Sequence, residues 1–164
     1  AYEILTCDWS SDVCSSDLWA VAFFLAVAAH GVMAAALAEA IAYESPACGC
    51  CRSWVEHMKA NGFTVSVIEQ HDIDVIEQRF DVPARLASCH TALAGGNVVE
   101  GYVPASAVKR LLQEKPAALG VSAPGMPVGS RGMASPNPEP FTVQLSDERG
   151  RMGEFESYRP PYRR

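Results

Sequence analysis

The chain has 164 residues and a formal net charge of −6, from 13 basic and 19 acidic residues. This length is sufficient for one domain with a buried core. The acidic balance argues against nucleic-acid binding, which depends on a basic stripe, and no glycine-rich phosphate loop occurs in the sequence. We therefore expect no nucleic-acid partner and look for function in the side-chain chemistry of smaller sites.

An apolar stretch near the start of the chain resembles a secretory signal peptide. Residues 18–38 read LWAVAFFLAVAAHGVMAAALA and end in small residues suited to cleavage before Glu39. The alternative is an uncleaved membrane anchor, because a span needs about 20 apolar residues. We favour the signal peptide, and thus expect an exported protein without stable membrane association after cleavage.

The residues before this stretch do not suit a signal peptide. No basic residue precedes Arg52, and residues 9–18 read WSSDVCSSDL, a string that resembles translated sequencing adapter. We therefore treat residues 1–17 as an artefact, together with Cys7 and Cys14. Four cysteines remain for functional reasoning: Cys48, Cys50, Cys51 and Cys89.

The chain from residue 39 alternates between strand and helix patterns. Ser45 and Pro46 suit the entry to a helix, and Asn61-Gly62 suits its end. The expected elements are a strand at 40–44, a helix at 48–60, a strand at 63–68, a helix at 72–80, a hairpin with arms at 89–93 and 97–102, and a helix at 104–114.

The resulting order, β-α-β-α-β-β-α, predicts an α/β protein with a thioredoxin-like domain over residues 39–114. In such a fold Pro83 would be the cis-proline that faces the cysteine motif. Residues 115–140 are rich in Pro, Gly and Ser, which predicts an irregular segment that wraps the site or lies on the surface. A terminal hairpin should complete this extension by residue 158, and residues 159–164 should be disordered.

Three cysteines lie within four residues at the start of the first predicted helix. Cys50 and Cys51 are neighbours, about 3.8 Å apart at Cα, whereas a disulfide usually needs about 4.4–6.8 Å. Cys48 and Cys51 lie one helical turn apart and can form a disulfide or share a metal ion. A helix N-terminus also lowers the pKa of a thiol placed there, which favours the thiolate that binds metal or attacks a disulfide.

A second sulfur–imidazole pair, Cys89-His90, follows the predicted proline turn. We expect the fold to bring it opposite the first motif, although successive strand residues point to opposite faces. Thiolates select soft ions such as Cu(I), and imidazole suits copper or zinc. His57 is a weaker candidate ligand, and Met126 and Met133 are equally suited to metal binding and to surface packing. Other side chains are expected to be structural: Trp54, Val55 and Met58 in the core, and His71 on the surface.

Four segments together resemble the CopG-like family of periplasmic copper-handling proteins, over about residues 40–146. They read PACGCCRSWVEHMKANGF, FDVPARLASCHTA, VVEGYVPASAVKRLL and PGMPVGSRGM. The resemblance implies a thioredoxin-like fold, a periplasmic location and a role in copper resistance, with copper redox chemistry and a second periplasmic copper protein as further expectations. The ligands that it implies are Cys48, Cys51, Cys89 and His90, with Cys50 a further candidate.

Two positions depart from that family pattern. Tyr102 stands where the family usually has His, and Arg131 stands where it usually has Pro. Both CGCC and CH motifs are intact, so we expect metal binding to be retained.

Two other functions compete with copper binding by this protein. One is a thiol–disulfide oxidoreductase that uses Cys48 and Cys51, with Cys48 as the attacking thiolate. The other is a structural zinc module with three cysteines and one histidine. Whether the protein is an enzyme depends on which of these functions holds.

Overall fold

A computed structural model describes residues 38–160 of the chain. The predicted artefact at residues 1–17, the predicted signal peptide up to Leu37 and residues 161–164 of the predicted tail lie outside the described residues. Within residues 38–160, no helix is both long enough and apolar enough to cross a bilayer.

The described chain forms a mixed α/β structure with seven strands and three helices, which confirms the predicted α/β class. The elements are β1 (Ala38–Glu44), α2 (Gly49–Ala60), β2 (Phe63–Glu69), α3 (Ile73–Arg79), β3 (His90–Ala94), β4 (Asn97–Gly101), α4 (Ala105–Glu114), β5 (Gly120–Ala123), β6 (Phe141–Ser146) and β7 (Met152–Tyr158).

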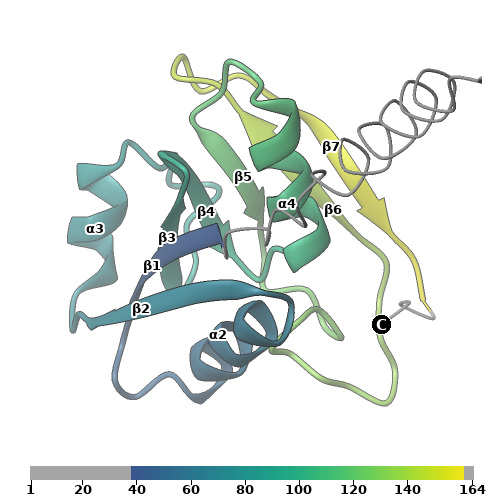
Figure 1. The fold of residues 1–164 in the computed structure, drawn as a ribbon. Helices are drawn as coiled ribbons and strands as arrows, with labels where there is room; N and C mark the ends of the chain where they lie inside the picture. Colours follow the sequence, from purple (N-terminus) through teal and green to yellow (C-terminus); the bar gives the residue numbers. More distant parts are fainter. Residues whose placement is uncertain (1–37, 161–164) are drawn as a thin grey trace, which may run out of the picture. The chain divides into compact units, whose positions relative to one another are not determined.

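All seven strands belong to one sheet with the order β2-β1-β3-β4-β5-β6-β7 (Figure 1). β1 is parallel to β2 and β4 is parallel to β5, while the other neighbours are antiparallel. The pairing of β1 with β3 aligns Glu44 with His90. The end of β1, which leads into the CGCC motif, therefore lies beside the start of β3, which follows Cys89.

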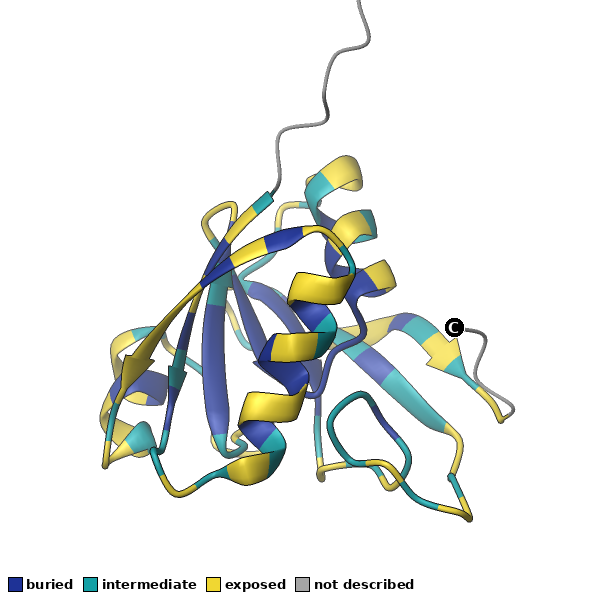
Figure 2. Cartoon of the chain, turned by 60° about the horizontal axis from the view of Figure 1, so that its bottom comes forward, coloured by how far each residue is buried: buried dark blue, intermediate teal, exposed yellow. Residues whose placement is uncertain are grey.

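The main core lies between α2, α4 and one face of the sheet. Buried residues of α2 alternate with exposed ones along the helix, so its apolar stripe faces the strands (Figure 2). Ala92 and Val99 are cross-strand partners that belong to this core, whereas Thr91 and Glu100 are partners on the opposite face. The predicted core residues Trp54, Val55 and Met58 are all buried.

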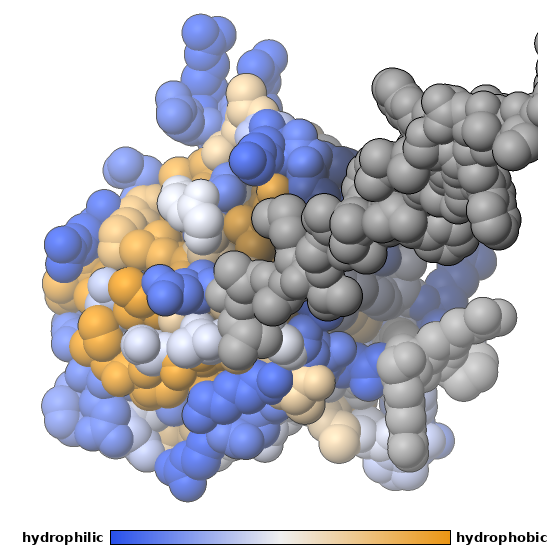
Figure 3. All heavy atoms as spheres, in the orientation of Figure 1, coloured by the Kyte–Doolittle hydropathy of each residue, from blue (hydrophilic) through white to orange (hydrophobic). Residues whose placement is uncertain are grey.

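The opposite face of the sheet is covered in part by α3. Figure 3 has the orientation of Figure 1. In the region of α3, β1 and β3 it shows apolar residues flanked by hydrophilic ones. Ile41 of β1 and Val75 of α3 are among the exposed large apolar side chains.

β5 is a strand that the sequence analysis missed, because it lies in the stretch predicted to be irregular. Its four residues are too few for a period-2 pattern to stand out. Gly120 has a packing role here, since a Cβ at this position would lie 1.9 Å from the carbonyl oxygen of Val98. Only glycine therefore lets β5 approach β4 this closely. The predicted terminal hairpin is formed by β6 and β7. It joins the sheet through the pairing of β6 with β5.

The expectation that Pro83 faces the cysteine motif is wrong. Pro83 lies in a turn, where its carbonyl accepts from the N–H of Leu86, and it lines a pocket with Val82, Leu86 and Glu100. Cys89, immediately before β3, takes the place opposite the motif. Pro83 comes after α3 has ended at Arg79 and lies six residues before Cys89 in the sequence.

His57 joins α2 to α4. Its Nε2 accepts a hydrogen bond from the N–H of Ala105, the first residue of α4, at 3.1 Å. That N–H has no partner within its own helix, so His57 acts as a cap supplied by another element. Burial, aided by the positive charges of Arg131 and Lys109, lowers the pKa of His57 from 6.5 to about 4. The imidazole of His57 is therefore neutral at pH 7 in the folded protein. Its ring is directed at the start of α4 and not at the cysteines.

We predict that His57 contributes to acid sensitivity. Its contribution to stability is fully present above pH 6.5 and is lost as the pH falls through about 4, because the unfolded chain takes up the proton first. In urea unfolding, His57→Gln, which retains a neutral acceptor, should lose less stability between pH 7.5 and pH 5 than wild type. His71→Gln, at an exposed position, is the control. Equal losses in wild type and His57→Gln would contradict this role.

Candidate metal centre

The turn between β1 and α2 presents Cys48 as the N-cap of α2. The N–H of Cys48 donates to the carbonyl of Ser45 at 2.9 Å, which closes the turn. Cys48 Sγ in turn accepts from the N–H of Cys51 at 3.2 Å. A sulfur thus takes the capping position that an oxygen usually fills, at the positive end of the helix.

Cys48 and Cys51 form a disulfide, and Cys50 and Cys89 are free thiols. Each sulfur of the disulfide has a free thiol beside it: Cys50 Sγ lies 3.4 Å from Cys48 Sγ, and Cys89 Sγ lies 3.3 Å from Cys51 Sγ. The disulfide sulfurs carry no proton, so they can only accept in these contacts.

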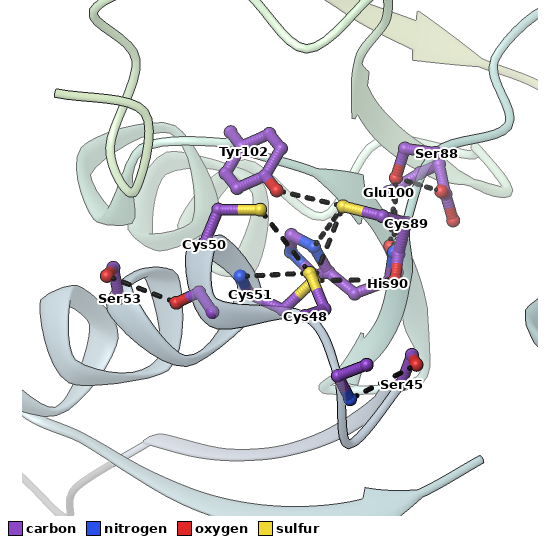
Figure 4. Close-up of a disulfide and its surroundings, with 12 residues drawn as sticks. Ser45, Cys48, Cys50, Cys51, Ser53, Ser88, Cys89, His90, Glu100 and Tyr102 are labelled. Carbon is purple, nitrogen blue, oxygen red and sulfur yellow. Dashed lines mark hydrogen bonds between the residues drawn. A yellow bond between two sulfur atoms is a disulfide. The ribbon is translucent and has the colours of Figure 1, made fainter. Parts of the chain in front are cut away.

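The four sulfurs form one compact group from two distant segments of the chain (Figure 4). All four Sγ atoms lie within 4.8 Å of one another, although 38 residues separate Cys51 from Cys89. The expected convergence of the two motifs is therefore what the structure shows. This cluster of Cys48, Cys50, Cys51 and Cys89 is called the sulfur cluster below.

His90 lies behind the sulfur cluster and not within it. Its side chain is fully buried between Trp54 and Tyr102, with ring centroids 4.6 and 5.0 Å away. Its Nδ1 is 3.9 Å from Cys89 Sγ, and its buried Nε2 has no hydrogen-bond partner among residues 38–160. Burial lowers the pKa of His90 to about 4, so the imidazole is neutral at pH 7. A neutral ring suits a metal ligand, and the assignment of His90 as one stays a prediction.

The irregular segment after α4 closes over one side of the cluster. A Cβ on Gly132 would lie 2.9 Å from the carbonyl oxygen of Cys50 and 3.0 Å from the ring of Tyr102. The backbone of Gly132, at φ +108, therefore lies directly against both residues. Next to it, Met133 is half-buried and packs against the core, whereas Met126 is exposed. Through Gly132, this segment lies against one side of the site.

A hydrogen-bond network that the sequence analysis missed holds the Cys89-His90 segment in place. Ser88 Oγ lies 2.5 Å from Glu100 Oε1 and donates to the carbonyl of His90, while Thr91 Oγ1 donates to Glu100 Oε2. The N–H of Ser88 donates to a second buried carboxyl, that of Glu77 on α3. This network anchors both residues that flank Cys89.

Burial raises the pKa of Glu100 to about 8, against the opposing effect of its hydrogen bonds. Glu100 accepts hydrogen bonds from the hydroxyls of Ser88 and Thr91, and these bonds favour the carboxylate. The effect of burial outweighs them. Buried glutamates on short strands have no sequence signature, and only the alternation of residues on β4 could have placed Glu100 on this face.

Once the Cys48–Cys51 disulfide is reduced, the sulfur cluster offers four thiols to a soft metal ion. At a sulfur–metal distance of about 2.3 Å, two sulfurs on one ion stand at most about 4.6 Å apart. The 3.3 and 3.4 Å pairs lie well inside this limit, and all four sulfurs lie within 4.8 Å of one another. Four thiols with partial burial and no carboxylate among them favour copper or zinc over hard cations.

Comparison with known proteins agrees with this chemistry. A family model described as "Protein of unknown function, DUF411" matches residues 86–133. The solved structure "Copper resistance protein copG- Form 2" is 33% identical with a TM-score of 0.71, and the match covers 74% of this chain and 98% of that one. "Copper resistance protein copG- Form 1" is 34% identical with a TM-score of 0.69, over 73% of this chain and 96% of that one. A search of the curated proteins gave no match.

The chain belongs to the CopG family. Membership and the sulfur cluster together fit a copper-binding role. All five residues of the predicted ligand set lie at or beside the cluster, with the four cysteines inside it and His90 adjacent.

We predict that metal binding requires prior reduction of the Cys48–Cys51 disulfide. Peptide mapping of the oxidised protein should find Cys48 linked to Cys51, with Cys50 and Cys89 open to alkylation. After reduction by a phosphine that is then removed, affinity for Cu(I) should rise about tenfold or more, since even loss of an outer-shell partner costs 10- to 100-fold. Equal affinity of the oxidised and reduced proteins would show that Cys48 and Cys51 are not ligands.

We also predict a pH-dependent effect of Glu100→Gln. Because the folded pKa of Glu100 is raised, its contribution to stability is complete below pH 4.5 and is lost as the pH rises through about 8. The neutral amide keeps the hydrogen bonds without this loss. Relative to wild type, the variant should therefore gain on the order of 1 kcal/mol or more in unfolding free energy between pH 5 and pH 8.

Chemical denaturation at several pH values measures this difference directly. Glu148→Gln, at an exposed turn position, is the matched control and should follow wild type. If the unfolding free energies of Glu100→Gln and wild type change equally with pH, Glu100 is ionised in the folded protein.

Proposed function

We propose that this protein binds copper as Cu(I) in the bacterial periplasm and serves copper resistance or homeostasis. The observation that carries the proposal is the sulfur cluster, in which Cys89 meets the CGCC motif across the paired ends of β1 and β3. Copper is the cargo of the site, and soft thiolates are the ligands that Cu(I) prefers. The copper-resistance relatives support this choice of metal over zinc.

The residues of the site have separable roles in this proposal. Cys48 and Cys51, once reduced, join Cys50 and Cys89 as thiolate ligands. The N-terminus of α2 stabilises the negative charge at Cys48, and the Ser88–Glu100 network holds Cys89 in place. His90 supplies a neutral nitrogen next to Cys89, and the wrapping segment at Gly132 limits access from one side.

The proposal includes a fold and a location. The strand order β2-β1-β3-β4, with the CGCC motif at the first strand-to-helix turn, supports a thioredoxin-like unit extended by β5–β7. The apolar stretch at residues 18–38 supports export, and a disulfide beside free thiols suits an oxidising compartment.

Copper stoichiometry, combined with electron paramagnetic resonance, tests the proposal. The reduced protein should bind Cu(I) without a paramagnetic signal and should bind it in preference to zinc when both are offered. Cys89→Ser should lower the copper content per chain and weaken binding about tenfold or more, because it removes the ligand contributed by the distant segment. Ser53→Ala, which changes an exposed α2 hydroxyl, is the control.

Two results would contradict the proposal. Preferential retention of zinc would favour the structural zinc module. Copper content that is unchanged by Cys89→Ser would show that the two motifs do not share the ion.

A second function, thiol–disulfide oxidoreduction, is favoured by one observation: Cys48 and Cys51 are bonded at a helix N-terminus. Cys50→Ser separates the two functions, because Cys50 lies outside the disulfide. Full insulin-reduction activity in this variant, with no copurifying metal, would favour the oxidoreductase. Loss of metal without any such activity in wild type would favour copper binding.

A further inference from the structure

Tyr102 points its hydroxyl into the sulfur cluster. It follows β4 directly, its side chain is fully buried, and its Oη lies 2.8 Å from Cys89 Sγ (Figure 4). The predicted ligand sets do not include this residue. A buried hydroxyl in contact with a thiol needs an explanation, because Phe would fill the same space without a polar atom to satisfy.

If Cys89 binds a metal ion as a thiolate, the Tyr102 hydroxyl is the group that can donate a hydrogen bond in this contact. A thiolate on a metal carries no proton, so the proton of the contact must come from Tyr102.

A hydrogen bond to a metal-bound thiolate withdraws electron density from the sulfur. Hydrogen bonds around a copper-ligating cysteine tune the redox potential of the site. The weaker donor sulfur disfavours Cu(II), which depends more on electron donation, relative to Cu(I). Outer-shell partners of this kind change metal affinity by 10- to 100-fold.

We propose that Tyr102 is a positioning residue that holds Cys89 by donating a hydrogen bond to its sulfur, and that this bond favours Cu(I) over Cu(II) in the site. The inference rests on the proposed copper-binding function. It assigns the oxidation-state preference of the site to one hydroxyl group that contacts the proposed ligand Cys89.

The ring of Tyr102 has a separate packing role, which the choice of variant must leave intact. It meets His90 edge to face at 5.0 Å and lies against the backbone of Gly132. Tyr102→Phe retains the ring and removes only the hydroxyl. Tyr158→Phe is the matched control, because the Tyr158 hydroxyl bonds Ser106 Oγ at 2.9 Å and has no contact with the cluster.

The experiment uses the full chain, reduced, in a background of Cys7→Ser and Cys14→Ser. Cu(I) affinity is measured by competition with a chromophoric chelator, and the Cu(II)/Cu(I) midpoint potential is measured by redox titration. In the metal-free protein, the infrared S–H stretching band reports the hydrogen bond of Cys89. Tyr102→Phe should lower Cu(I) affinity about tenfold or more, shift the potential downward and shift the S–H band, while Tyr158→Phe should match wild type.

The outcomes separate this inference from the proposed function. If wild type binds Cu(I) and Tyr102→Phe has the same potential, the inference is overturned although the function stands. A loss of affinity without a change in potential shows only a structural role and also overturns it. If wild type binds no copper, the proposed function fails. In that case, an S–H band that is the same in Tyr102→Phe and wild type would show that Tyr102 makes no hydrogen bond to Cys89, and the inference would fail as well.

Discussion

The sulfur cluster depends on one backbone constraint, the antiparallel pairing of β1 with β3. The register aligns Glu44, the last residue of β1, with His90, the first residue of β3. The chain leaves β1 through the CGCC turn and enters β3 through Ser88 and Cys89. The two motifs therefore meet at the same end of these neighbouring strands. A one-residue slip would turn every side chain of β3 to the other face and separate Cys89 from Cys51.

The constraint explains why polar groups are buried directly behind the site. Cys89 stands outside the regular ladder, and its neighbours must be fixed without strand pairing of their own. Ser88 and Thr91, on either side of Cys89-His90, both bind the carboxyl of Glu100. Burying an ionised carboxylate would be costly, so the group shifts its pKa upward and is held neutral. The network thus restrains the cysteine segment without placing negative charge next to the thiolates.

Much of the site could be predicted from the sequence because its parts carry local signals. Cys48 is marked by the strand-to-helix turn, and helical spacing places it next to Cys51. The convergence of Cys89 with this motif was expected because Cys89 follows the predicted proline turn of a thioredoxin-like order of strands and helices. The position of Pro83 did not follow, because the length of the turn between α3 and β3 is not encoded in its composition. β5 and Glu100 were missed for a common reason: each is defined by long-range contacts, with Val98 in one case and Ser88 in the other.

The same geometry supports two chemistries, and the protonation and oxidation state of the cysteines decides between them. With Cys48 and Cys51 bonded, each disulfide sulfur touches a free thiol, which is the arrangement for exchange between neighbouring sulfurs. With the Cys48–Cys51 bond reduced, the four thiols lie close enough together to act as ligands around a soft ion. A bound ion ties up the thiolates that exchange needs, and a disulfide removes two ligands that the ion needs. Copper binding and disulfide chemistry are therefore mutually exclusive states of one cluster. Cys89 is a free thiol in the first state and the proposed ligand in the second. The Tyr102 hydroxyl contacts it, so this contact bears on both chemistries.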